Sequence, residues 1–253
     1  MNEFKPIKPL KEAARAQLIG RYGIAIPAIL MIFAIQFITM LLSDSGSNGS
    51  VGSYLLKYAI SLIIDLLMGI LIFGKSLFFL KMARCRTDAT VKDIFFGFKN
   101  NGDKAVLVQL PFTFISFLCS LPMVLINLGI IPCPTAKYFH VVLIFLGIQI
   151  VALFVARLFL GLSFYILADR PNLSVPEILS ESIRLMTNKK GRLFLICLSV
   201  LPFMILGALG LIFGLLWVEA FYQTLLADFY LETVGETLGD PVKSQNPGDG
   251  CST

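Results

Sequence analysis

Five long apolar stretches occupy most of this chain, and they restrict the folds open to it more than any other feature. Four have 19 to 29 residues, enough for one helix that crosses a bilayer. The fifth, residues 193–229, would form a helix of roughly 55 Å, nearly twice a hydrocarbon core of about 30 Å. Gly207, Gly210 and Gly214 interrupt it. The sequence therefore predicts an all-α integral membrane bundle of six transmembrane helices, with spans at about 24–42, 58–80, 105–126, 139–167, 193–209 and 213–233.

The basic residues are divided unequally between the two sides of this arrangement. Of the 21 Lys and Arg residues, 19 fall on one side, and only Lys57 and Lys137 remain for the other. Short loops rich in Lys and Arg stay in the cytoplasm. We therefore expect a multi-pass protein with a cytoplasmic N-terminus and, for six spans, a cytoplasmic C-terminus. A five-span alternative places the C-terminal segment outside, and only Lys243 opposes it.

The composition fits a membrane domain better than a soluble one. Hydrophobic residues make up 57% of the chain, charged residues 15%, and the mean hydropathy is +0.82. The net charge of +5 follows from the loop bias, so anionic lipid head groups are the expected partners and nucleic acid is not. We expect a single membrane domain, residues 1–234, followed by a disordered cytoplasmic tail, residues 235–253, which is polar and contains Gly and Pro.

An internal repeat is visible in the loops on the basic side. Thr90-Val-Lys-Asp93 and Ser174-Val-Pro-Glu177 have the spacing of a helix N-cap followed by an acidic third residue. Apolar residues follow each cap at helical spacing, which predicts two interfacial helices, and residues 10–18 are a looser copy. Each such helix precedes two spans. The sequence thus predicts three parallel repeats, each an interfacial helix and a two-span hairpin.

Three ionisable residues lie well inside the predicted spans: Asp65, Arg157 and Glu219. Charged side chains are costly in a bilayer, where they pair or line polar pathways. If the helices descend together, Arg157 and Glu219 lie at nearly equal depth, roughly 18–20 Å from the inner ends. We expect an intramembrane polar cluster in which Arg157 pairs with Glu219, Asp65 or both, as a structural ion pair or as a pocket for transport or lipid head groups. Lys75, near the end of its span, is expected to snorkel.

Signs of catalysis are missing from the sequence. The five cysteines show no metal-ligand spacing, and no G-x-S-x-G, P-loop or H-E-x-x-H motif is present. The single histidine, His140, is expected at the outer interface. The aromatic residues Phe95, Phe96 and Phe98 suit the head-group layer, or a surface that docks a cytosolic partner. We expect no enzyme activity, no metal and no cofactor.

Four stretches carry a resemblance to a known family: Phe164–Pro171, Ser174–Met186, Leu193–Ser199 and Gly214–Tyr230. Together they resemble a bacterial family of polytopic membrane proteins, the domain of unknown function 975. Its members typically show a Tyr-Ile-Leu-Ala-Asp-Asn-Pro motif and a closing Trp-x-x-Pro-Tyr span. Here Arg170 stands in place of the Asn, and Glu219-Ala220 replaces the apolar-Pro pair. The resemblance implies a six-span fold in the bacterial cell membrane, and it implies no particular activity.

Three functions are compatible with these features. The one we favour is a non-enzymatic scaffold or accessory factor that works with lipid, membrane or cytosolic protein partners. The alternative is a transporter or permease-like subunit with an intramembrane polar site, energised by a partner or an ion gradient because no nucleotide-binding motif is present. An enzyme acting on lipid phosphodiesters ranks last. It rests on a loose likeness to membrane domains attached to glycerophosphodiester phosphodiesterases, whose separate catalytic domain this chain lacks.

Overall fold

The computed structural model describes residues 7–44, 51–84, 89–132, 135–187, 189–209 and 211–235. Within these ranges all regular elements are helices and there is no strand, which confirms the predicted all-α class. The predicted tail lies, from residue 236 onward, outside the described residues.

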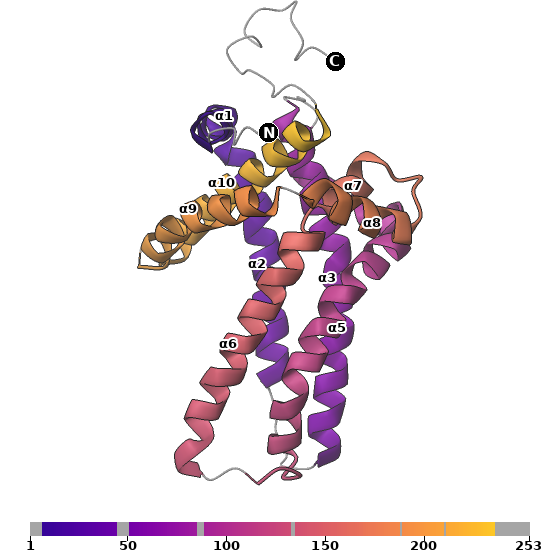
Figure 1. The fold of residues 1–253 in the computed structure, drawn as a ribbon, viewed down its shortest axis with the longest axis vertical. Coiled ribbons are helices and arrows are strands. Elements are labelled where there is room, and N and C mark those ends of the chain that lie inside the picture. Colours follow the sequence, from indigo (N-terminus) through magenta and orange to yellow (C-terminus); the bar gives the residue numbers. More distant parts are fainter. Residues whose placement is uncertain are drawn as a thin grey trace, which may run out of the picture.

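Four long helices stand side by side and form the elongated part of the molecule (Figure 1). They are α2 (Tyr22–Asp44), α3 (Val51–Ala83), α5 (Gly102–Asn127) and α6 (Thr135–Leu160). Large apolar side chains such as Phe114, Leu118 and Ile144 remain exposed on their outer faces. A helix that is apolar on all sides is stable only in a protein core or in lipid. This part of the molecule therefore has the surface of a membrane domain.

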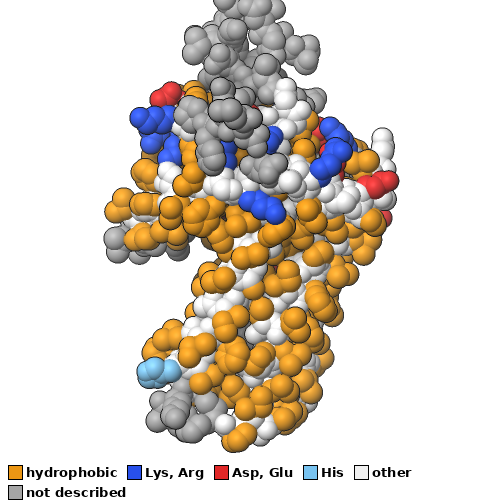
Figure 2. All heavy atoms as spheres, in the orientation of Figure 1, with side chains coloured by type: hydrophobic (Ala, Val, Ile, Leu, Met, Phe, Trp, Pro, Cys, Tyr) orange, Lys and Arg blue, Asp and Glu red, His pale blue; other side chains and the backbone are white. Residues whose placement is uncertain are grey.

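The short helices gather at one end of the long ones (Figure 1). They are α1 (Ile7–Leu18), the 3-10 helix η1 (Val91–Phe95), α4 (Phe96–Lys99), α7 (Ser163–Asp169) and α8 (Val175–Met186). Figure 2 shows the visible Lys and Arg side chains concentrated at this same end, whereas the long helices present an almost entirely hydrophobic surface. We term the end that carries the short helices and these cations the basic end. The unequal distribution of charge along the sequence is thus also present in space.

Two of the short helices begin at the predicted caps. The backbone N–H of Thr90 donates to Asp93 Oδ2 at 2.8 Å, and that of Ser174 donates to Glu177 Oε2 at 2.8 Å. Both capping boxes are formed. The second opens a regular α-helix as predicted, whereas the first opens a 3-10 turn that continues into the four-residue α4.

The segment η1 packs directly on the backbone of α3. A Cβ atom at Gly74 would lie 1.9 Å from the carbonyl oxygen of Ile94, so only glycine fits at this position. The Ile94 side chain is itself fully buried. This contact fixes η1 beside Lys75, the next residue of α3.

The last two helices, α9 (Lys190–Leu209) and α10 (Leu211–Val234), form an antiparallel hairpin. Their backbones approach closely, because a Cβ on Gly214 would lie 2.7 Å from the carbonyl oxygen of Gly207. Small residues at such a contact are typical of helices packed in membranes. The hairpin is inclined to the four long helices, and its turn ends well short of their far ends (Figure 1). The helix α10 packs against α1, α2 and α3.

By length and apolarity, the described residues contain four candidate membrane spans: Val51–Ala83, Gly102–Asn127, Tyr138–Asp169 and Lys190–Gly207. The pair α1 and α2 adds a fifth if it is one span bent by 95°. Each of the six predicted spans corresponds to a helix or, for 139–167, to α6 and α7 with a break at Gly161 and Leu162. Six crossings and three repeats remain predictions.

Candidate functional site

The structure places Asp65 on the face of α3 that packs against α5. The Thr113 hydroxyl of α5 donates a hydrogen bond to Asp65 Oδ2. Lys75 lies ten residues further along α3, roughly 15 Å away at 1.5 Å per residue. Asp65 thus belongs to the contact between two long helices and has a polar partner of its own.

Glu219 pairs with Lys75. The Lys75 ammonium lies 3.2 Å from Glu219 Oε1, with only 16% and 19% of the two side chains exposed. The Gln223 amide, one turn along α10, donates to the same oxygen at 2.6 Å. The Tyr165 hydroxyl of α7 in turn donates to Gln223 at 3.2 Å. These four residues, Lys75, Glu219, Gln223 and Tyr165, form what we term the Lys75 cluster.

Arg157 does not join an ion pair with either predicted partner. It lies exposed near the end of α6, and no described carboxylate lies within 4 Å of its guanidinium. The predicted pairing of Arg157 with Glu219 or Asp65 is therefore corrected. The reason is geometric: the prediction assumed that α10 descends beside α6, whereas α10 leans across α3 and brings Glu219 to Lys75.

The Lys75 cluster combines an acid, a base, an amide and a phenol from three helices. The stability of the protein should depend on both charged residues, Lys75 and Glu219, because removal of either one leaves the other charge largely buried without a partner. Among the residues that the structure describes, no group of three or more His, Cys, Asp or Glu side chains could hold a metal ion. The cluster can fix the register of α3, α7 and α10.

A second set of ion pairs connects neighbouring helices at the basic end. Lys81 binds Asp93 at 2.8 Å and so fastens η1 to the end of α3. Arg84 binds Asp169 at 2.7 Å, and the Tyr230 hydroxyl donates to the other oxygen of that carboxylate at 2.9 Å. These contacts connect α3, α7 and α10, so the basic end is held together by charge as well as by apolar packing.

One polar contact between α1 and α10 is unusual. The Gln17 amide nitrogen donates to Asp228 Oδ1 at 2.9 Å and weakly to the Ala83 carbonyl at 3.4 Å. Gln17 is 3% exposed and Asp228 is 0% exposed. Gln17 Oε1 and Asp228 Oδ2 are both buried without a hydrogen-bond partner among the described residues. Buried polar atoms are nearly always paired.

Comparison with known proteins identifies the family and nothing more specific. A family model described as a protein of unknown function, DUF975, matches residues 1–236. No curated protein and no solved structure matches the chain.

Proposed function

We propose that this chain, which belongs to the DUF975 family of proteins of unknown function, is a non-enzymatic scaffold or accessory factor of the bacterial cell membrane. In this proposal it crosses the bilayer six times as three repeats. The basic end faces the cytoplasm, together with both chain ends. The separation of charge in Figure 2 carries the proposal, because short basic segments are retained on the cytoplasmic side.

The arrangement of α1 and α10 supports this sidedness. Because α9 and α10 are antiparallel, α10 returns the chain to the basic end, where Asp228 accepts a hydrogen bond from Gln17 of α1. The two ends of the described chain therefore lie on one side whether the inclined hairpin crosses the whole bilayer or only part of it.

The polar groups favour a scaffold over a moving carrier. Glu219 is satisfied by Lys75 and Gln223, and Asp65 by Thr113, so these side chains hold helices together. Two cavities, one between α1–α2 and the α9–α10 hairpin and one between α7, α8 and the end of α10, are lined by neither Lys75 nor Glu219. The ion pairs at the basic end add a rigid platform.

The exposed aromatic side chains of that platform supply a surface for a partner. Phe95, Phe96 and Phe98 are 43%, 40% and 58% exposed on η1 and α4, beside the exposed cations Lys92 and Lys99. Aromatic and basic side chains together suit anionic head groups, and they also suit an acidic protein surface. The proposed partners are thus anionic lipid and a membrane or cytosolic protein.

The alternative function is that of a transporter or permease-like subunit, and one observation favours it. The Lys75 cluster contains a largely buried acid–base pair, Lys75 and Glu219, within the predicted spans, and such pairs mark ion and proton pathways.

A comparison of single and double variants of this pair tests whether it holds the helices together, as the scaffold proposal requires. We expect Lys75→Met and Glu219→Leu to destabilise the protein by about 3–5 kcal/mol each, and the double variant to recover most of the loss. Lys92→Met, which removes an exposed cation from η1, is the matched control and should leave stability unchanged. Thermal unfolding of each purified protein measures this.

Proteoliposomes loaded with a pH-sensitive dye test the transport alternative directly. The scaffold proposal expects the wild-type protein and the double variant to pass protons no faster than empty vesicles under an imposed membrane potential. A proton flux in the wild type that disappears in a well-folded double variant would overturn the scaffold proposal and establish the alternative.

A further inference from the structure

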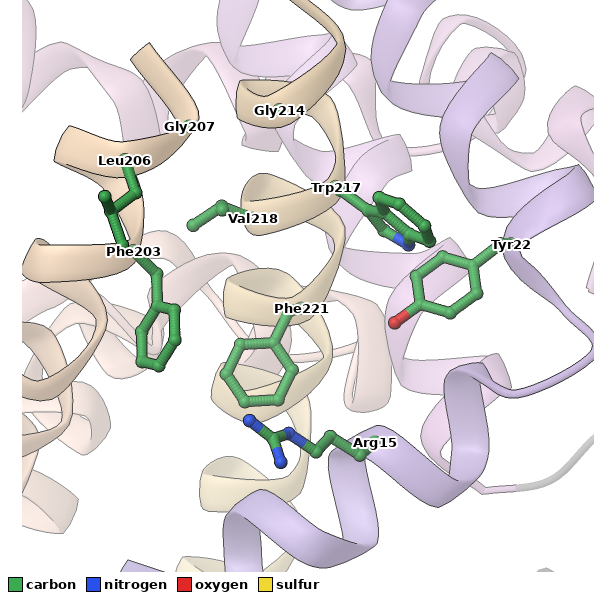
Figure 3. Close-up of a pocket in the computed structure, with 9 residues that line it drawn as sticks. All are labelled: Arg15, Tyr22, Phe203, Leu206, Gly207, Gly214, Trp217, Val218 and Phe221. Carbon is green, nitrogen blue, oxygen red and sulfur yellow. The ribbon is translucent and has the colours of Figure 1, made fainter. Parts of the chain in front are cut away.

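We propose that a groove between α1–α2 and the α9–α10 hairpin binds one anionic phospholipid, with its phosphate at Arg15 and an acyl chain along α10. The groove has a volume of about 380 Å³, within the range of roughly 300–1,000 Å³ typical of ligand sites. Figure 3 shows its lining residues, which come from both sides of the opening. The inference rests on the proposed placement of the protein in a membrane.

The polar groups of the groove lie at one end. Arg15 is exposed on α1, with its guanidinium carbon 5.9 Å from the centre of the Phe221 ring. Within the described part of the chain, no carboxylate lies within 4 Å of Arg15, unlike Lys81 or Arg84, which pair with acids. The Tyr22 hydroxyl points into the groove on the side of Phe221 and Arg15 (Figure 3). A cation and a hydroxyl are thus directed at the same space.

The rest of the groove is apolar and aromatic. Phe203 and Leu206 of α9 lie on the side of Val218 and Phe221 of α10, and Trp217 points to the other side of α10, toward Tyr22 (Figure 3). The close contact of Gly207 and Gly214 lies at the far end. From Phe221 to Gly214 the groove follows α10 for roughly 10 Å, at 1.5 Å per residue. A free phosphate would gain nothing from this surface, whereas a lipid places an acyl chain on it and its head group at Arg15.

Aromatic packing holds the opening in shape. The Tyr22 and Trp217 rings meet edge to face, with centroids 5.3 Å apart and planes at 88°. This geometry is the favoured one for aromatic pairs. Trp and Tyr side chains also prefer the head-group level of a bilayer. The pair therefore stands where the polar and apolar parts of a lipid meet.

Charge complementarity selects an anionic lipid over a zwitterionic one. Besides Arg15, the first helix and the turn after it carry Lys8, Lys11 and Arg21, against one acidic residue, Glu12. A choline head group would bring a further cation into this positive field, whereas the glycerol of phosphatidylglycerol leaves the phosphate charge uncompensated.

Trp217 provides the measurement, because it is the one tryptophan in the chain and it lines the groove. The full-length protein is reconstituted in equal mixtures of phosphatidylglycerol and phosphatidylcholine, with bromine on the acyl chains of one lipid or the other. Bromine quenches tryptophan fluorescence only at short range. We expect phosphatidylglycerol to be favoured beside Trp217 by about fivefold, the effect of one cation near an anionic surface.

Matched variants identify the site. Arg15→Gln should reduce the fivefold preference to near one, whereas Arg15→Lys should retain most of it. Lys8→Gln removes the same charge two turns away on α1, from a residue that does not line the groove, and should reduce the preference much less than Arg15→Gln does. Val218→Phe fills the groove while leaving Arg15 in place, and it should weaken the preference even if Arg15→Gln does not fold.

Three results would overturn the proposal. Equal quenching by the two brominated lipids in the wild type means that Trp217 meets bulk lipid. An equal loss in Lys8→Gln and Arg15→Gln means that general surface charge, not this groove, attracts the lipid. No quenching by either lipid would refute the membrane placement as well, so the two failures are distinguishable.

Discussion

The hydrogen-bond donors and acceptors at the contact between Gln17 and Asp228 predict the protonation state of Asp228. Gln17 Oε1 and Asp228 Oδ2 are hydrogen-bond acceptors that are buried without a donor. The Gln17 amide nitrogen donates a hydrogen bond to the other carboxylate oxygen, Asp228 Oδ1, at 2.9 Å. A proton on the Asp228 carboxyl would satisfy both atoms at once, since an acid and an amide then exchange two hydrogen bonds. We therefore expect Asp228 to be neutral in the folded protein.

The substitution that tests this is Asp228→Asn, with Asp228→Ala as its comparison. Asparagine offers the same donor and acceptor as a neutral acid, so its effect should be within about 0.5 kcal/mol of zero. Alanine leaves the Gln17 amide without its partner and opens a small cavity, which should cost about 2–4 kcal/mol.

Thermal unfolding of the purified protein in a mild detergent measures the difference. At about 2–4 °C per kcal/mol for a chain of this size, alanine should lower the midpoint by several degrees, and asparagine should leave it almost unchanged. If asparagine destabilises the protein as much as alanine does, the carboxyl is ionised and this reasoning is wrong.

Three further predictions test other parts of the structure. Gly74→Ala should separate η1 from α3 because its Cβ would meet the Ile94 carbonyl, and proteolysis within 85–95 should accelerate; unchanged cleavage would contradict this. In a cysteine-free background, Leu209→Cys should react with an impermeant thiol reagent outside intact cells, because six crossings place this end of the hairpin outside; an unlabelled cysteine would contradict the sixfold crossing. The hydrogen bond from the Ser174 backbone lowers the pKa of Glu177. The cap therefore stabilises α8 at neutral pH and is lost as the pH falls through that lowered pKa, so Glu177→Gln should reduce the acid sensitivity of α8 seen by hydrogen exchange.

The helices themselves could be predicted because their signals are local. Long apolar runs, basic loops and the two caps at Thr90 and Ser174 act over a few residues, and the structure has helices in each of those places. The buried face of α1 was also readable, with Leu10, Ala14 and Leu18 on one side. Gln17 lies on that same face, and a polar residue within an apolar stripe was the available signal for its buried contact.

The partner of Glu219 could not be predicted in the same way. Depth counted along each helix places two charges at one level only when the helices are parallel, and α10 is inclined to the others. The inclination depends on packing between residues distant in the sequence, such as Tyr22 of α2 against Trp217 of α10. Lys75 was assigned to the interface because it lies near a span end, yet only 16% of its side chain is exposed.

The fit of Ile94 against Gly74 has a mechanical consequence. Because no side chain lies between the backbones of η1 and α3 at this contact, a displacement of η1 cannot be taken up by a change of side-chain conformation there. A protein that presses on Phe95 or Phe98 would push α3 as well, and the first side chain beyond the point of contact is Lys75. Force on these aromatic side chains would therefore reach the ion pair of Lys75 with Glu219, one residue beyond the contact at Gly74.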